Sequence, residues 1–123
     1  MALHNELGVL GEEAALQLLR RKSYTILEKN WRSGRTEVDI IARLGKELVI
    51  AEVKSRHRGY LESPLDAVNR KKQKLLIRAA GAYISKTGLD LEVRFDIIVV
   101  IFENDGVFRV HHIENAFYPI AGG

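Results

Sequence analysis

Residues 35–56, RTEVDIIARLGKELVIAEVKSR, contain two runs of β-branched and large apolar residues on either side of a short Leu-Gly-Lys interval. This pattern predicts two β-strands, at 37–43 and 47–55, joined by a two-residue hairpin turn at Gly45 and Lys46. The second run is apolar in both phases, which is typical of a central strand covered on both faces of its sheet. The segment therefore predicts a sheet enclosed between layers rather than an exposed hairpin.

The rest of the chain predicts helices and further strands around this segment. Residues 6–21 are apolar at helical spacing, which predicts a first helix. A second helix is expected from Ser63, an N-cap followed by proline, to Gly88. The other predicted elements are strands at 24–32, 92–102 and 106–113, followed by a tail at 114–123. The expected order is α-β-β-β-α-β-β, an α/β fold in which a single domain, 1–123, has a central mixed sheet flanked by helices.

The composition suits one domain in a reducing compartment. The 123 residues are 46% hydrophobic, enough to bury a core, and the absence of cysteine excludes disulfides and thiolate metal sites. No apolar run approaches the ~20 residues of a membrane-spanning helix, and the first residues lack the basic-then-apolar order of a signal peptide. We therefore expect a cytoplasmic protein with no membrane partner, in which any metal is bound through oxygen or imidazole.

Basic residues outnumber acidic residues and are clustered along the sequence. Nineteen lysines and arginines against sixteen acidic residues give a formal charge of +3. Many of the basic residues fall in three short segments, RSGR, SRHRG and NRKKQK. Charge runs are most often solvated faces, and the alternative is one basic surface that faces a polyanion.

Four charged residues interrupt the apolar strands of the opening segment. With the predicted turn, Asp39 falls opposite Glu52, and Glu37 opposite Lys54, on one face of the sheet. Two carboxylates about 5 Å apart repel by roughly 3 kcal/mol at an effective dielectric near 20, and a cation between them reverses the sign. A hairpin with one wet face is the simpler explanation of these charges. The two-sided apolar run instead favours a cleft that holds a divalent metal.

Two more charged residues lie on the apolar faces of the predicted helices. Glu12 precedes apolar residues at i+3, i+4 and i+7, and Lys72 precedes leucines at i+3 and i+4. For either residue alone, a side chain that reaches out from the edge of an apolar stripe is the simpler explanation. Their coincidence with the charged strands favours a common site.

This ordered set of residues resembles a known nuclease motif. Glu12 on a helix, Asp39 on one strand and the Glu-Val-Lys triplet 52–54 on the next resemble the PD-(D/E)XK nuclease superfamily. The segments GEEAALQLL, NWRSGRTEVDIIAR, LVIAEVKSR, SPLDAVNRKKQKLL and RFDIIVV resemble the YraN family of small bacterial proteins, which are similar in fold to archaeal Holliday-junction resolvases. The resemblance spans nearly the whole chain and implies a restriction-endonuclease-like fold. Thr36 departs from the pattern, because the family usually has glycine before Glu37.

The resemblance implies a metal-dependent endonuclease that hydrolyses phosphodiester bonds in DNA, with branched or junction DNA as a candidate substrate. It makes Asp39, Glu52 and the Val53 backbone carbonyl ligands of Mg²⁺, which Mn²⁺ can replace, with Glu12 acting through a second metal or a water. Lys54 is the implied catalytic lysine, and Glu37 a supporting residue. The residues expected to contact nucleic acid are Arg32, Arg35, Arg56, Arg58, Lys71, Lys72 and Lys74. Since resolvases act as dimers, a homodimer is a further candidate.

Two other classes of function stay open. A nucleic-acid-binding module without turnover would use the same basic residues, and a protein-interaction domain would bind no metal. The intact set of charged residues favours the enzyme. Trp31 and Tyr60 are candidates to stack on a base, although a core position is the stronger expectation for Trp31. His57, His111 and His112 are outside the motif and receive no role.

Overall fold

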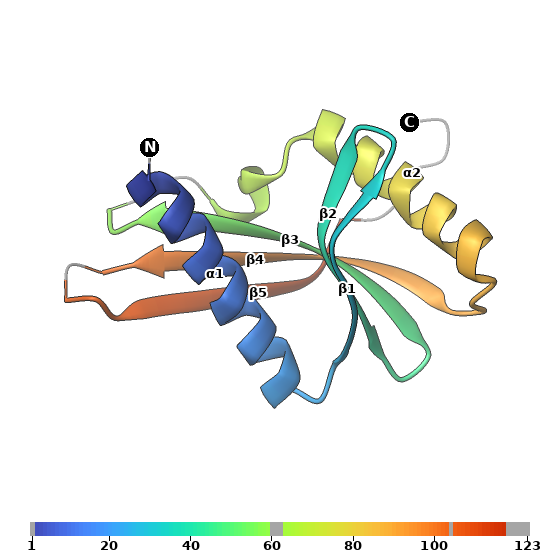
Figure 1. The fold of residues 1–123 in the computed structure, drawn as a ribbon, viewed down its shortest axis with the longest axis horizontal. Coiled ribbons are helices and arrows are strands. Elements are labelled where there is room, and N and C mark those ends of the chain that lie inside the picture. Colours follow the sequence, from blue (N-terminus) through green and yellow to red (C-terminus); the bar gives the residue numbers. More distant parts are fainter. Residues whose placement is uncertain (1, 60–62, 104, 118–123) are drawn as a thin grey trace.

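A five-stranded sheet between two helices forms the framework of the chain (Figure 1). The structure is a computed structural model that describes residues 2–59, 63–103 and 105–117. The elements are α1 (Ala2–Arg21), β1 (Thr25–Ser33), β2 (Thr36–Leu44), β3 (Glu47–His57), a 3₁₀ helix η1 (Pro64–Ala67), α2 (Arg70–Thr87), β4 (Glu92–Phe102) and β5 (Phe108–Phe117). The predicted α/β layout and the order α-β-β-β-α-β-β are confirmed.

The sheet is mixed, and β3 lies at its centre. The strands lie in the order β1-β2-β3-β4-β5; β3 and β4 are parallel, and the other neighbours are antiparallel. Since a parallel pair needs a long crossover, η1 and α2 connect β3 to β4. Residues 48–52 of β3 are all buried, as the two-sided apolar run predicted.

The predicted hairpin turn is confirmed, but the pairing of the charged residues is not. Leu44 pairs with Glu47 and Ile40 with Ala51, so the turn falls at Gly45 and Lys46. The described β2–β3 pairing ends at Ile40 and Ala51, and Figure 1 shows β2 leaving β3 beyond this point. The prediction that the charged residues of β2 and β3 pair directly across the sheet is therefore wrong.

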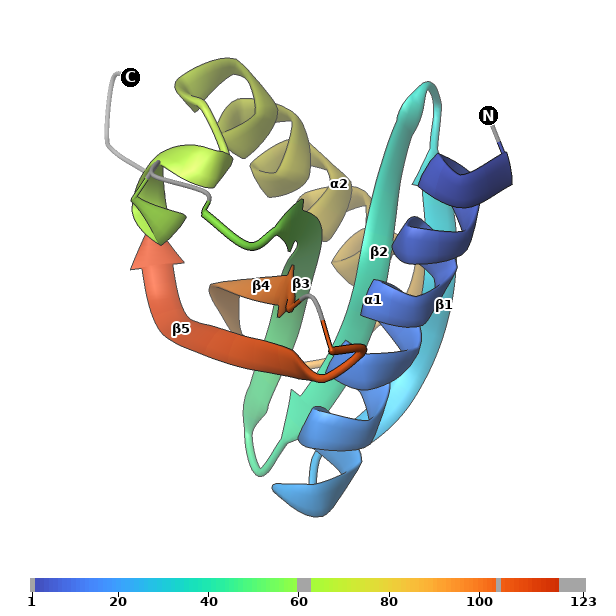
Figure 2. The ribbon, with the colours of Figure 1, turned by 90° about the vertical axis from the view of Figure 1, so that its left-hand side faces the viewer.

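Two apolar layers enclose the sheet. On one face α1 packs Ala15 and Leu19 with Val49 of β3, and on the other face α2 packs Leu76 with Ile50 (Figure 2). Gly11 lets α1 approach β3 closely, because a Cβ at this position would lie 1.9 Å from the Ser55 hydroxyl oxygen. This close approach places the next residue of α1 beside the end of β3.

Two predicted boundaries need correction. The second helix does not run from Ser63 in one piece, because η1 ends at Ala67 and α2 starts after Asn69. The Asn69 side chain is the N-cap of α2 and accepts a hydrogen bond from the Lys72 backbone N–H at 2.8 Å. Gly88 ends α2 in the left-handed conformation, as expected.

At the end of the chain, the predicted tail is also partly wrong. Strand β5 continues to Phe117, four residues beyond the predicted end of the strand at residue 113. Residues 118–123, and the candidate stacking residue Tyr60, lie outside the described residues. Trp31 packs beside the α2 layer with its ring edge-on to Tyr83, so the expected core position is confirmed. Among the described residues, no helix is both long and apolar enough to cross a membrane.

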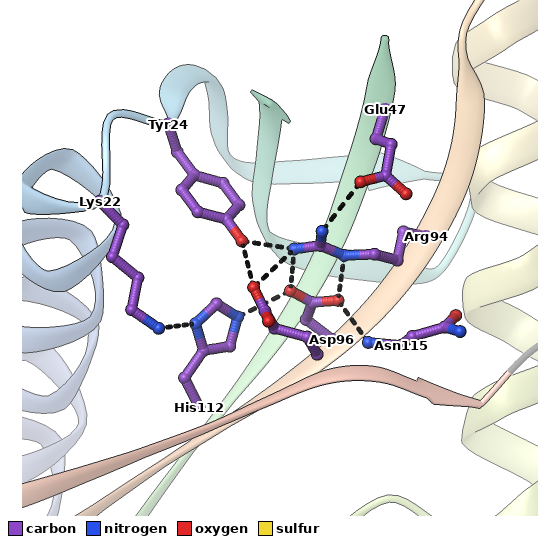
Figure 3. A network of polar contacts seen from close by, with 8 residues as sticks. Lys22, Tyr24, Glu47, Arg94, Asp96, His112 and Asn115 are labelled. Atoms are coloured by element: carbon purple, nitrogen blue, oxygen red, sulfur yellow. Dashed lines mark hydrogen bonds and ion pairs between the residues drawn. The ribbon is translucent and has the colours of Figure 1, made fainter. Parts of the chain in front are cut away.

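A buried polar network joins β3, β4 and β5 to the segment between α1 and β1 (Figure 3). Arg94 of β4 donates to both carboxylate oxygens of Asp96, at 2.9 and 2.8 Å, and to Glu47 of β3 at 3.0 Å. Asp96 also contacts the His112 ring at 2.7 Å, and Tyr24, which precedes β1, contacts Arg94. Asp96 is fully buried. The network was not foreseen, since its members are polar residues scattered through otherwise apolar strands.

Candidate active site

Where the described pairing of β2 with β3 ends, a side chain takes the place of a backbone partner. Asp39 of β2 lies at this point, and its Oδ2 accepts a hydrogen bond of 2.8 Å from the Val53 backbone N–H. A side-chain carboxylate therefore replaces a backbone carbonyl as the partner of β3. This hydrogen bond links Asp39 to β3 at the point where β2 separates from β3.

Glu52 is the most unusual carboxylate of the site, because it is buried. Its side chain is 5% exposed, and Oε2 lies 3.6 Å from Nζ of both Lys54 and Lys72. Within the described structure, Oε1 has no hydrogen-bond partner. Burial, followed by the negative charge of Asp39, raises the pKa of Glu52 to about 8, and the two lysines only partly offset this rise.

A hollow of about 230 Å³ opens beside these residues, between the start of α1 and the end of β3. Its walls include Glu12, Asp39 and Lys54, together with Arg56 and His57. Glu12 reaches the hollow because Gly11 brings α1 against β3. Burial, followed by the charges of Asp39 and Glu37, raises the pKa of the Glu12 carboxyl, which makes it a stronger proton acceptor than an exposed glutamate.

The structure brings together five of the residues selected from the sequence: Glu12, Asp39, Glu52, Lys54 and Lys72. Lys72 was expected in this common site and also among the residues that contact nucleic acid. It is half-buried, and its Nζ also lies 3.5 Å from the Glu37 backbone oxygen. Its place is therefore in the carboxylate cluster. Glu37 does not pair with Lys54; its carboxylate binds Arg32 of β1 at 2.8 Å.

The other basic residues lie at the surface, with different partners. Lys71, Lys74 and Arg35 are exposed. Arg58 is 3.6 Å from Glu103, and Arg56 donates to the Ser55 carbonyl while lining the hollow. Arg56 therefore adds a positive charge to the wall of the hollow at the end of β3.

Sequence reasoning missed one residue of the site, Asn30 of β1. With its amide nitrogen facing α1 and β2, Asn30 donates to Glu12 Oε1 and Glu37 Oε1, each at 3.0 Å. Its backbone has a φ of 52° in the middle of the strand. Asparagine tolerates this conformation better than most residues, so an asparagine among strand-forming residues was the available signal.

The donor set suits a hard divalent cation such as Mg²⁺, although the ligands are few. Across the described ranges, no three histidine, aspartate or glutamate side chains are grouped as a ready-made metal site. Mg²⁺ commonly takes only one or two carboxylates and keeps several waters. Asp39 and Glu52 supply two such groups, and the unpaired buried Oε1 of Glu52 is an acceptor that a cation would satisfy.

The raised pKa of Glu52 predicts that the stability of the protein depends on pH. The folded protein binds the proton of the Glu52 carboxyl more tightly than the unfolded chain does. The protonated carboxyl therefore stabilises the fold fully below about pH 4.5, and this contribution is lost as the pH rises through about 8. In EDTA, we expect the free energy of unfolding to fall by roughly 3 kcal/mol between pH 5 and 8 because of this group, at about 1.4 kcal/mol per unit.

Urea unfolding of the wild type and of Glu52→Gln at pH 5, 6.5 and 8 checks this expectation. The amide cannot titrate, so its pH profile should be flatter by that amount. Parallel profiles for the two proteins would show that Glu52 has an ordinary pKa.

The fold and the site define a class: an α/β protein in which a buried glutamate meets two half-buried lysines and further carboxylates where two strands of its central sheet separate. Residues 11–100 match the family described as "Uncharacterised protein family UPF0102". A UPF0102 protein of Bacteroides thetaiotaomicron is 50% identical over 119 residues, which cover 97% of this chain and 98% of that protein. A UPF0102 protein of Flavobacterium psychrophilum is 46% identical over 118 residues, which cover 96% and 98% of the two chains. The chain belongs to the UPF0102 family, whose members are YraN-like.

Proposed function

We propose that this protein is a metal-dependent endonuclease of the PD-(D/E)XK type that hydrolyses phosphodiester bonds in DNA. The observation that carries the proposal is the buried Glu52, which lies beside Asp39 and between two lysines at the split of β2 and β3. A structural carboxylate in this position would be expected to have both oxygens satisfied. Among the described residues, nothing donates a hydrogen bond to one oxygen of Glu52, which supports a role for it in binding a cation.

The residues of the hollow supply the groups that hydrolysis requires. Asp39, Glu52 and the Val53 carbonyl would hold Mg²⁺, which stabilises negative charge on a phosphate and lowers the pKa of water when it is bound. Lys54 lines the hollow and offsets negative charge that develops on the phosphate. Glu12 would contribute to metal binding through a water, and its carboxylate accepts a proton from the attacking water. One P–O bond forms to that water and one breaks, leaving a phosphate monoester and a free hydroxyl.

A cleavage panel tests the proposal directly. Single-stranded, duplex, flap and four-way DNA are incubated with the protein and Mg²⁺ or Mn²⁺, beside the Asp39→Ala protein. We expect wild-type cleavage of at least one substrate, no cleavage in EDTA, and a loss of activity in Asp39→Ala. Equal cleavage by wild type and Asp39→Ala would mean that another protein or another site is responsible.

The exposed lysines at the start of α2 are the proposed contacts to the phosphate backbone. Lys71 and Lys74 are exposed beside the half-buried Lys72, which lies in the carboxylate cluster. We expect Lys71→Ala with Lys74→Ala to weaken binding to all DNA sequences alike. Each lost phosphate contact should lower the slope of log K against log salt by about 0.7 to 0.9.

A matched control removes two exposed lysines elsewhere. Lys46 lies in the β2–β3 turn, and Lys86 in the last turn of α2. Fluorescence anisotropy at several salt concentrations should show the wild-type slope for Lys46→Ala with Lys86→Ala. If the Lys71 and Lys74 variant also keeps the wild-type slope, the start of α2 faces away from the DNA.

One observation favours a second function, DNA binding without turnover. In the absence of metal, Lys54 and Lys72 occupy the neighbourhood of the Glu52 carboxylate that a cation would need. A protein in which the lysines replace the metal would keep the fold and bind nucleic acid. Calorimetry with Mn²⁺ separates the two proposals, because only the enzyme binds the ion.

A further inference from the structure

We propose that Asn30 is a positioning residue that holds the Glu12 carboxylate in the orientation needed to bind the metal ion. The inference rests on the proposed metal-dependent function. It adds a neutral residue on the edge strand β1 to a site otherwise built from charged residues of α1, β2, β3 and α2.

The contacts of the Asn30 side chain support this role. Its amide group has two N–H bonds, and the two acceptors within 3.0 Å of the nitrogen are carboxylate oxygens from two different elements, Glu12 of α1 and Glu37 of β2. The opposite orientation of the amide would aim its oxygen at both acceptors, so the nitrogen is assigned to this side. One neutral group thus fixes the separation of two negative charges.

The backbone of Asn30 supports the same role. Asn30 lies between Lys29, which pairs with Ile40, and Trp31, which pairs with Val38, so it stands beside Asp39. Its φ of 52° is unusual for a residue other than glycine. Strained positions of this kind persist where the surroundings hold them, and they concentrate at functional sites.

Two further contacts connect Asn30, through Glu37, to the exposed Arg32. Arg32 binds Glu37 Oε2 at 2.8 Å, and the other oxygen of Glu37 accepts from Asn30. Asn30 in turn donates to Glu12 Oε1. Glu12, Glu37 and Asp39 repel one another, so removal of the amide should let the Glu12 side chain move away from Asp39.

Asn30→Gly tests the role of the amide separately from that of the backbone. Glycine adopts a φ of 52° without strain, so the variant should fold with a melting temperature close to that of the wild type. We expect the Kd for Mn²⁺, measured by calorimetry without DNA, to increase about 10- to 100-fold, which is typical when a hydrogen-bond partner of a metal ligand is lost. Asn115→Gly is the matched control, because Asn115 is exposed on β5 with the same φ of 52°.

A second measurement shows whether Asn30 acts through Glu12. In a Glu12→Ala background, Asn30→Gly should change the Kd for Mn²⁺ by less than about twofold, since coupled residues are not additive. A full further loss in that background, or an equal loss in Asn115→Gly, would overturn the inference. So would wild-type affinity in Asn30→Gly, which would leave the endonuclease proposal intact. Failure of the wild type to bind Mn²⁺ would instead overturn the proposed function and this inference together.

Discussion

Asp96→Asn is expected to lower the free energy of unfolding by roughly 3 to 5 kcal/mol, the usual cost of removing one partner of a buried ion pair. Asp96 is fully buried and accepts two hydrogen bonds from Arg94, at 2.9 and 2.8 Å, and one from the Asn115 backbone N–H at 3.0 Å (Figure 3). Burial alone would raise the pKa of Asp96, but hydrogen bonds with His112 and Arg94 lower it overall. The carboxylate is therefore the charged partner that Arg94 requires.

The loss should be large because the remaining partners of Arg94 are closer to solvent. Glu47 and Glu114 have side chains that are 40% and 53% exposed, against 10% for Arg94. Asparagine keeps the size of the side chain but leaves the buried guanidinium without its main counter-charge.

Urea unfolding at pH 7 in EDTA measures the effect, with Asp90→Asn as the matched control. Asp90 is exposed between α2 and β4, so its substitution should change stability by less than about 0.5 kcal/mol. A loss below about 1 kcal/mol in Asp96→Asn would show that the network contributes little to stability.

Lys54→Met is expected to lower the cleavage rate by about 10² to 10³ while leaving the fold intact, if the proposed mechanism is correct. The Lys54 side chain is 28% exposed, lines the hollow and lies 3.6 Å from Glu52. Methionine fills similar space, and the ammonium is not a metal ligand, so Mn²⁺ binding should change only a few-fold. A lysine that only paired with a carboxylate at the surface would contribute about 0 to 1 kcal/mol to stability and nothing to the rate.

Single-turnover cleavage at a fixed Mg²⁺ concentration provides the measurement, once a wild-type rate is established. Lys86→Met, on the exposed last turn of α2, is the control for loss of a positive charge. If Lys54→Met cleaves as fast as the wild type, Lys54 is not catalytic and its charge serves solvation.

The sequence alone determined the order of the helices and strands and one register of the sheet. The turn at Gly45 and Lys46 is local, so the spacing of two neighbouring runs was enough to predict the pairing of Leu44 with Glu47. The central position of β3 followed from residues that are apolar in both phases, since only a strand covered on two faces has that pattern. The resemblance to the YraN family was carried by the same ordered segments, and the match of residues 11–100 to UPF0102 confirms that resemblance.

The tertiary structure decided how the charged residues meet. The register predicted Asp39 opposite Glu52, but the described pairing with β3 does not include the residues of β2 that precede Ile40. The Asp39 carboxylate instead accepts a hydrogen bond from the Val53 N–H. Strand spacing cannot predict this separation, because it depends on how β1 and β2 twist away from the rest of the sheet.

The same reason explains the contacts that sequence reasoning could not specify and the residue that it missed. Lys72 reaches Glu52 from α2, 20 positions along the chain, and Asn30 meets Glu12 from a different element. Arg94 and Asp96 of β4 form a buried network with His112 of the neighbouring strand β5. Periodicity determines which face of an element is apolar, because it arises from the geometry of that element alone. Contacts between polar groups of distant elements depend on the packing of whole layers, so only the folded chain determines them.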